Sequence, residues 1–136
     1  MALGPGWTPP QGARALVGAI LGGDLRSGPA VAGTLVEREP GVLVFWFHNE
    51  GRATAVDLRF LYRDEDGGVV RREIGNLAPG ASSSERLDHA PAEPFEALWV
   101  CRVRHGHLRV WAYDGRVSRL RRRDIADGDI FGAVYG

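Results

Sequence analysis

The stretch "VLVFWFHNEGRATAVDLRFLYRDEDG", residues 42–67, is the most informative part of the sequence for the fold class. An apolar run reaches His48, the segment 49–51 (Asn-Glu-Gly) interrupts it, and a strict alternation of apolar and polar residues follows. A period of two is typical of a β-strand with one buried face. The alternation predicts one face with Val56, Leu58, Phe60 and Tyr62, and another with Asp57, Arg59 and Arg63. We therefore expect two strands joined by a corner at residues 49–51. There the Asn49 side chain can bond its own turn and Gly51 can adopt a positive φ.

The same period extends outward in both directions from this stretch. Short apolar-patterned segments recur, separated by Gly, Pro, Asn and Asp residues that favour turns. Within 95–104, Trp99, Cys101 and Val103 face one side, and Leu98 and Val100 face the other, which indicates a central strand. We expect strands at 32–38, 42–48, 54–63, 68–74, 81–87, 95–104 and 107–114, with 116–120 as a further piece.

The N-terminal segment carries a helix signal after a short arm. Thr8 and Gln11 fit a capping box, with Pro9 at the first helical position. An apolar stripe at helical spacing follows and ends at Gly22-Gly23; its members are Ala13, Leu16, Val17, Ile20 and Leu21. The sequence thus predicts a short helix whose stripe lies on this protein's own sheets or on a partner.

A family resemblance is carried by "FHNEGRATAVDLRFLYRDEDG" together with "REIGNLAPGASSSERL". These segments resemble bacterial and archaeal immunoglobulin-like domains of the CARDB and DUF11 types. Such domains have an Asn-x-Gly corner and an Ile-Gly-x-Leu-x-Pro-Gly signature, and the matching residues here are Asn49, Gly51, Ala55, Ile74, Gly75, Leu77, Pro79 and Gly80. The resemblance covers residues 42–87 and more weakly 95–114. It implies a non-catalytic spacer, adhesion, decoration or connector module.

The resemblance and the pattern together predict an all-β protein. We expect an immunoglobulin-like β-sandwich of about seven to eight antiparallel strands with a short N-terminal helix. The expected organisation is an arm and helix at 1–28, the sandwich at 29–120 and a docking tail at 121–136.

Composition narrows the function classes. The 136 residues carry a formal net charge of zero, which does not favour nucleic acid or anionic membrane as a partner. The single cysteine, Cys101, excludes an internal disulfide, and its apolar strand favours a buried structural thiol. We expect no cleaved signal peptide and no membrane span, because neither a basic leader nor a long apolar run is present. Virion or cytoplasm is the favoured location.

The histidines give the sharpest chemical hypothesis. In an immunoglobulin-like sandwich the loops after 42–48 and 95–104 lie at one end. This arrangement would bring together a possible ligand or metal end formed by His48, Asn49, Glu50, His105 and His107. Imidazoles with a carboxylate can bind zinc. However, residues 105–107 straddle a tight turn that splays the two rings, so solvated loop histidines are the structural alternative and no metal or cofactor is expected.

The charged and apolar stretches of the C-terminal tail have structural interpretations too. A cluster of arginines leaves the last strand, where a solvated or acid-paired tail is favoured over nucleic-acid contact; it comprises Arg119, Arg121, Arg122 and Arg123. Residues 124–129 lack EF-hand spacing and are interpreted as a loop. The apolar segment 130–135 either adds a strand to a neighbour's edge or covers its own core.

The sequence therefore predicts a non-enzymatic structural or interaction module of a larger assembly, such as a capsid-decorating or connector component of a phage virion. No serine elbow or phosphate-cradling loop is present. Protein partners, including further copies, would bind the terminal segments through Trp7, Leu16, Ile20, Phe131, Val134 and Tyr135. A ligand-binding or adhesion module using the histidine end is the alternative, and a metal-dependent enzyme is the third interpretation.

Overall fold

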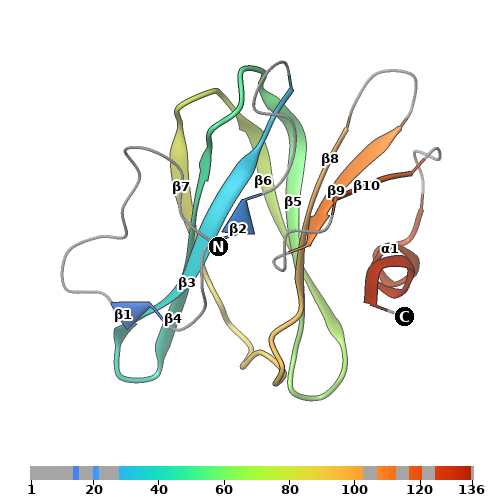
Figure 1. Cartoon of the computed structure of the whole chain (residues 1–136). Coiled ribbons are helices and arrows are strands. Elements are labelled where there is room, and N and C mark those ends of the chain that lie inside the picture. The colour runs from blue at the N-terminus through green and yellow to red at the C-terminus, as the bar shows by residue number, and fades with distance from the viewer. Residues whose placement is uncertain are drawn as a thin grey trace.

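The computed structural model describes residues 14–15, 20–21, 28–102, 107–112, 117–120 and 125–135. Within these ranges the chain forms strands and one C-terminal helix (Figure 1). In chain order the elements are β1 (Arg14–Ala15), β2 (Ile20–Leu21), β3 (Val31–Glu39), β4 (Val42–Asn49), β5 (Ala55–Arg63), β6 (Val69–Leu77), β7 (Ser82–Arg86), β8 (Ala97–Arg102), β9 (Leu108–Ala112), β10 (Val117–Leu120) and α1 (Asp127–Tyr135).

The described strands form two antiparallel sheets. In one sheet β4 pairs with β3 and β7, and the short strands β1 and β2 both pair with the far edge of β3. In the other sheet the order is β10-β9-β8-β5-β6. The predicted all-β class is confirmed, and β8 is a central strand, as its two apolar faces indicated.

The main core lies between the two sheets, which face each other in Figure 1. Trp99 of β8 is at its centre, with ring centroids 4.5 Å from Phe47 of β4 and 4.5 Å from Phe60 of β5. All three side chains are fully buried. Burial of such aromatic surface supplies most of the favourable free energy that holds two sheets together.

A second core lies on the opposite face of the β5–β8–β9 sheet. Leu98 and Val100 of β8 belong to it, whereas their neighbours Trp99 and Cys101 belong to the main core, as the alternation predicted. α1 covers this face with side chains that are fully buried, Ile130 and Phe131. The sheet needs a cover there because both of its faces are apolar.

A bulge in β5 changes the predicted faces of its first residues. Asp57 has a φ of 51°, and the pairing register shifts between Ala55 and Leu58. Leu58 therefore faces the main core, but Ala55 replaces Val56 there, and Val56 pairs with Arg102. The prediction that Val56 shares a face with Leu58 was wrong, because one extra residue inverts the alternation.

The prediction of an N-terminal helix was wrong over the described residues. Arg14–Ala15 and Ile20–Leu21 are strands that pair with β3. A short segment interrupted by Gly12 and Gly18 forms only a marginal helix alone. The unpaired edge of β3 offers main-chain hydrogen bonds instead. The rest of the predicted helix, including Thr8, Leu16 and Val17, lies outside the described residues.

The prediction of a loop at residues 124–129 was wrong from Asp127 onward, where α1 begins. The apolar segment 130–135 is part of this helix and covers the protein's own sheet, which was one of the two alternatives. Its first turn carries Asp127 and Asp129, and acidic side chains stabilise the positive end of a helix dipole.

Candidate functional site

The corner after β4 is organised by the Asn49 side chain, which is fully buried. Its Oδ1 accepts hydrogen bonds from the main-chain N–H of Gly51 at 2.9 Å and of Ala30 at 3.2 Å. Its Nδ2 donates to the carbonyl oxygens of Ala53 and Leu77, both at 2.9 Å. The amide thus joins its own turn to the start of β3 and the end of β6, and its hydrogen-bonding groups are satisfied.

Main-chain bonds reinforce the same corner. The Asn49 N–H donates to Ala81 O at 3.0 Å, and Gly80 N–H donates to Asn49 O at 2.8 Å. Gly80 has a φ of 79° and follows Pro79, and Ala81 N–H donates to Ala78 O at 3.0 Å. These are the features of a type II turn, in which the third position favours glycine. The Pro-Gly turn and the Asn corner therefore hold each other in place.

Gly51 is required at the corner for a different reason from the one predicted. The glycines with positive φ among the described residues are Gly41, Gly67, Gly75 and Gly80, so the expected positive φ at Gly51 was wrong. Instead, a Cβ at Gly51 would lie 2.2 Å from Gly28 O and 2.5 Å from Ala30 N. Because Gly51 has no side chain, residues 28–30 can pass close to its backbone.

Glu50 and His48 are the titratable groups beside the corner. Both carboxylate oxygens of Glu50 are buried without a hydrogen-bond partner. Burial raises the pKa of Glu50 above its ordinary value, and the nearby charge of His48 opposes part of that rise. The His48 ring nitrogen Nδ1 lies 2.7 Å from Ser82 Oγ on β7, so one side of the imidazole already has a partner.

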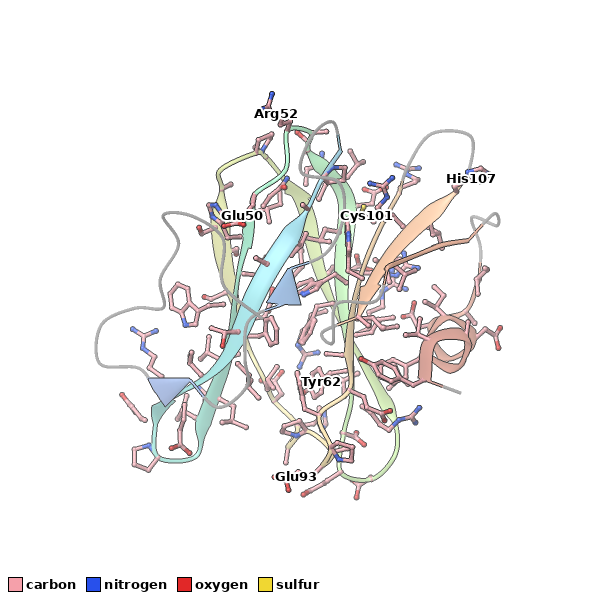
Figure 2. The ribbon with its side chains drawn as sticks, in the orientation of Figure 1. Glu50, Arg52, Tyr62, Glu93, Cys101 and His107 are labelled. Atoms are coloured by element: carbon pink, nitrogen blue, oxygen red, sulfur yellow. The ribbon has the colours of Figure 1, made fainter. Side chains whose placement is uncertain are left out.

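The structure brings only part of the predicted ligand end together. Figure 2 shows Glu50 beside β4 and His107 at the start of β9, on different sheets and well apart. His107 is half-buried, and His105 lies outside the described residues. Within the described parts of the chain, no group of three or more His, Cys, Asp or Glu residues could hold a metal ion. Asn49 cannot act as a free ligand, because its amide is already satisfied.

The predicted partner-binding residues have varied positions. Trp7 and Leu16 lie outside the described residues, and Ile20 pairs with Gly33 in the β2–β3 ladder. Phe131 is fully buried beneath α1, while Val134 and Tyr135 are half-buried. These three C-terminal side chains pack against the protein's own sheet, and Phe131 would become available to a partner only if α1 moved away.

Sequence reasoning missed the anchors that hold α1. The Asp127 carboxylate lies 3.3 Å from Arg59 Nε and 3.2 Å from Arg71 Nη1. Arg63 places its guanidinium 4.8 Å from the centroid of the Phe131 ring, a cation–π geometry. Tyr135 Oη donates to Ala97 O at 3.0 Å. The spacing of Phe131, Val134 and Tyr135 (i, i+3, i+4), with acidic residues before them, was the available signal for a docked helix.

Three further side chains that could take part in catalysis have structural roles as well. Burial raises the pKa of the Cys101 thiol to about 12, so it is neutral at physiological pH and unsuited to nucleophilic attack. Asp64 Oδ1 accepts from Asp66 N–H at 3.0 Å and from Gly68 N–H at 2.9 Å, which fixes the β5–β6 turn. The Tyr62 hydroxyl donates to His89 O at 3.0 Å and holds the loop before β8.

No family model, curated protein or solved structure matches this chain. In the part of the chain that the structure describes, no helix is long and apolar enough to cross a membrane.

Proposed function

We propose that this chain is a non-enzymatic, immunoglobulin-like module that acts as a structural or interaction component of a larger assembly. The strand order supports the immunoglobulin-like assignment. The order β3-β4-β7 in one sheet and β6-β5-β8-β9 in the other corresponds to the two sheets of that fold. The Asn49 corner joins β4 in the first sheet to β5 in the second. A capsid-decorating or connector protein of a phage virion is the setting we favour.

The observation that carries the proposal is that several side chains capable of chemistry are buried or already bonded within the fold. Asn49 and Asp64 are engaged in turns, and Cys101 is a buried neutral thiol. Hydrolytic or group-transfer chemistry needs a nucleophile or base that is aligned and accessible to a substrate. A module whose polar groups mainly hold its own fold is better suited to present a surface to other proteins.

The alternative with a specific observation in its favour is a ligand-binding module at the corner. The Glu50 carboxylate is desolvated, has no hydrogen-bond partner and lies beside His48. A small cation or a hydrogen-bond donor would complete such a carboxylate. This alternative predicts saturable binding that is lost in Glu50→Gln and kept in Glu65→Gln, an exposed acid of the β5–β6 turn.

Assembly is tested by light scattering and sedimentation velocity over a wide range of concentration. We expect the full chain to associate, and a variant that lacks residues 1–23 to lose part of that association. Zinc titration with the His48→Ala, His105→Ala, His107→Ala triple variant tests the metal hypothesis. A monomer that is indifferent to the deletion, together with zinc binding that the triple variant abolishes, would overturn the proposal.

A further inference from the structure

The outer edge of β6 is a strand edge to which the described fold gives no partner. β6 is the last strand of its sheet, and among the described residues no strand pairs with its outer edge. It is nine residues long, whereas β7, beside it at the edge of the other sheet, has five. A long edge strand is a template for pairing with another chain.

The main-chain groups that β6 leaves open can be identified from the ladder. Arg63 of β5 directs its N–H to Glu96 O at 3.1 Å and its carbonyl to Ala92 N–H at 2.9 Å, on the β8 side. Direction alternates along an antiparallel strand, so residues 59, 61 and 63 all bond toward β8. Their partners on β6 are Glu73, Arg71 and Val69, and these residues therefore direct their N–H and C=O groups to the open edge. The Arg71 carbonyl already accepts from Arg72 Nη1 at 3.1 Å and has a second lone pair for a bond to another chain.

We propose that β6 pairs with β6 of a second copy of this chain, antiparallel about a two-fold axis at Arg72. Two conditions fix which registers are possible. Residues that share a sheet face must lie opposite one another, and residues with outward main-chain groups must meet. Among Val69, Arg71 and Glu73, five registers meet both conditions: Val69 opposite Val69, Val69 opposite Arg71, Arg71 opposite Arg71, Arg71 opposite Glu73, and Glu73 opposite Glu73 of the second copy.

Charge selects among these registers. Arg71 and Glu73 form an ion pair within one chain, and both remain exposed, with 46% and 65% of their side-chain surface accessible to a second copy. Arg71 opposite its own copy, or Glu73 opposite its own copy, would set like charges against each other across the strands and would form no Arg–Glu pair between the copies opposite each other. Val69 opposite Val69 or opposite Arg71 sets no opposite charges against each other. The register with the axis at Arg72 is the one of the five that gives two Arg–Glu pairs between the copies, and it also closes four main-chain hydrogen bonds between residues 71 and 73 of the two copies.

The inner face of the same register is also compatible with pairing. Val70 would lie opposite Ile74 of the second copy, and both residues are half-buried apolar side chains packed against the main core. Arg72 would lie opposite Arg72 of the second copy, but its guanidinium already bridges to Asp88, and Glu85 is near enough to interact with it. The carboxylates offset the repulsion between the two guanidinium groups.

This inference deepens the proposed function by naming a second copy as one partner, and it rests on that proposal. The two fail separately, because an assembly through other surfaces would survive every change in β6. The interface is a short strand pair, so we expect a weak dimer that forms at high protein concentration.

The decisive experiment mixes two charge-reversed variants. Arg71→Glu gives Glu opposite Glu in its own dimer, and Glu73→Arg gives Arg opposite Arg. Each variant alone should dimerise about tenfold more weakly than the wild type in sedimentation velocity. A 1:1 mixture restores both Arg–Glu pairs and should recover the wild-type association. Arg86→Glu, a charge reversal at the exposed edge strand β7, is the matched control and should leave association unchanged.

The mixture also separates an interface effect from damage to the fold. Arg71→Glu removes a partner of Asp127, so loosening of α1 is expected in that variant, but loosening alone cannot restore dimers on mixing. Arg72→Cys provides a second readout, because only a residue on the axis meets its own copy and forms a symmetric disulfide under mild oxidation. A mixture that stays monomeric, or a wild type that is monomeric throughout, overturns the inference.

Discussion

The corner at Asn49 and the edge at β6 use their polar groups in opposite ways. At the corner a single buried amide makes four hydrogen bonds, two within its own turn and two to segments that are distant in the chain. At the edge, alternate residues of an exposed strand direct main-chain groups away from their own sheet. A buried polar group without a partner is costly, whereas an edge group in water is not.

This contrast indicates where the molecule can gain a function without losing its fold. A substitution at the corner removes bonds that the folded state needs. A substitution of an exposed residue on the outward face of β6 mainly changes what the protein presents to others, although Arg71 also bonds Asp127 of α1. Substitutions at the corner and elsewhere in the core should therefore change the stability of the folded state. The change should be largest where the most contacts are removed.

Asn49→Ala should have the largest effect. It removes four hydrogen bonds and leaves buried main-chain groups of Ala30 and Leu77 without a partner, so we expect about 3–5 kcal/mol of lost stability in urea unfolding. Asn76→Ala is the matched control, because Asn76 is exposed and accepts a bond from Asp57 N–H at 3.1 Å. It should cost about 1 kcal/mol. Equal losses at the two positions would show that the corner is not special.

Phe131→Ala tests whether α1 is an integral part of the fold. The ring is fully buried against the second core, so its removal should cost about 3–4 kcal/mol. Alanine is the better helix former, and helix propensity alone therefore predicts a slight gain. Gly128→Ala, where a Cβ meets nothing within 4 Å, should raise stability by about 0.5–1 kcal/mol. An unchanged thermal midpoint in Phe131→Ala would mean that α1 contributes nothing in solution.

The features that sequence predicted well depend on local pattern. The strands from β3 to β9 follow from period-two alternation and from turn residues, which are visible within a few positions. The turn bond of Asn49 was predicted, and Gly51 N–H makes it at 2.9 Å. The bonds of the same side chain to Ala30 and Leu77 span 19 and 28 residues, and no local pattern specifies them.

The errors have the same physical origin. The bulge at Asp57, a residue with a positive φ, exchanges the two faces at the start of β5. The composition of that segment does not predict it. β1 and β2 are strands because β3 offers an edge, and α1 is a helix because sheet β5–β8–β9 offers an apolar face. Marginal local propensity gives way to tertiary packing in both segments. The dispersal of His48 and His107 likewise depends on how the two sheets meet.

Gly51→Ala should have an intermediate effect. The added Cβ would lie 2.2 Å from Gly28 O, which is backbone and cannot rotate away. We expect a loss of about 2–3 kcal/mol, measured by chemical denaturation. Gly67→Ala is the control, since its φ is 88° but a Cβ there meets nothing within 4 Å. Its cost should be about 1 kcal/mol. A larger loss at Gly67 would indicate that strain, and not crowding, governs the glycines of this protein.

Glu50→Gln should have the smallest effect, and its sign depends on pH. Burial raises the pKa of Glu50 above 4.5 in the folded state, so the folded state disfavours the charged carboxylate. The contribution of this group to stability is therefore fully present below pH 4.5 and is lost as pH rises through the folded-state pKa. Wild type and Glu50→Gln should unfold at the same urea concentration below that range, and the variant should be the more stable at pH 7. Glu65→Gln, an exposed acid, should follow the wild type throughout. If the stability of wild type and that of Glu50→Gln changed with pH in the same way, the Glu50 carboxylate would lie in water and would not be part of the buried corner.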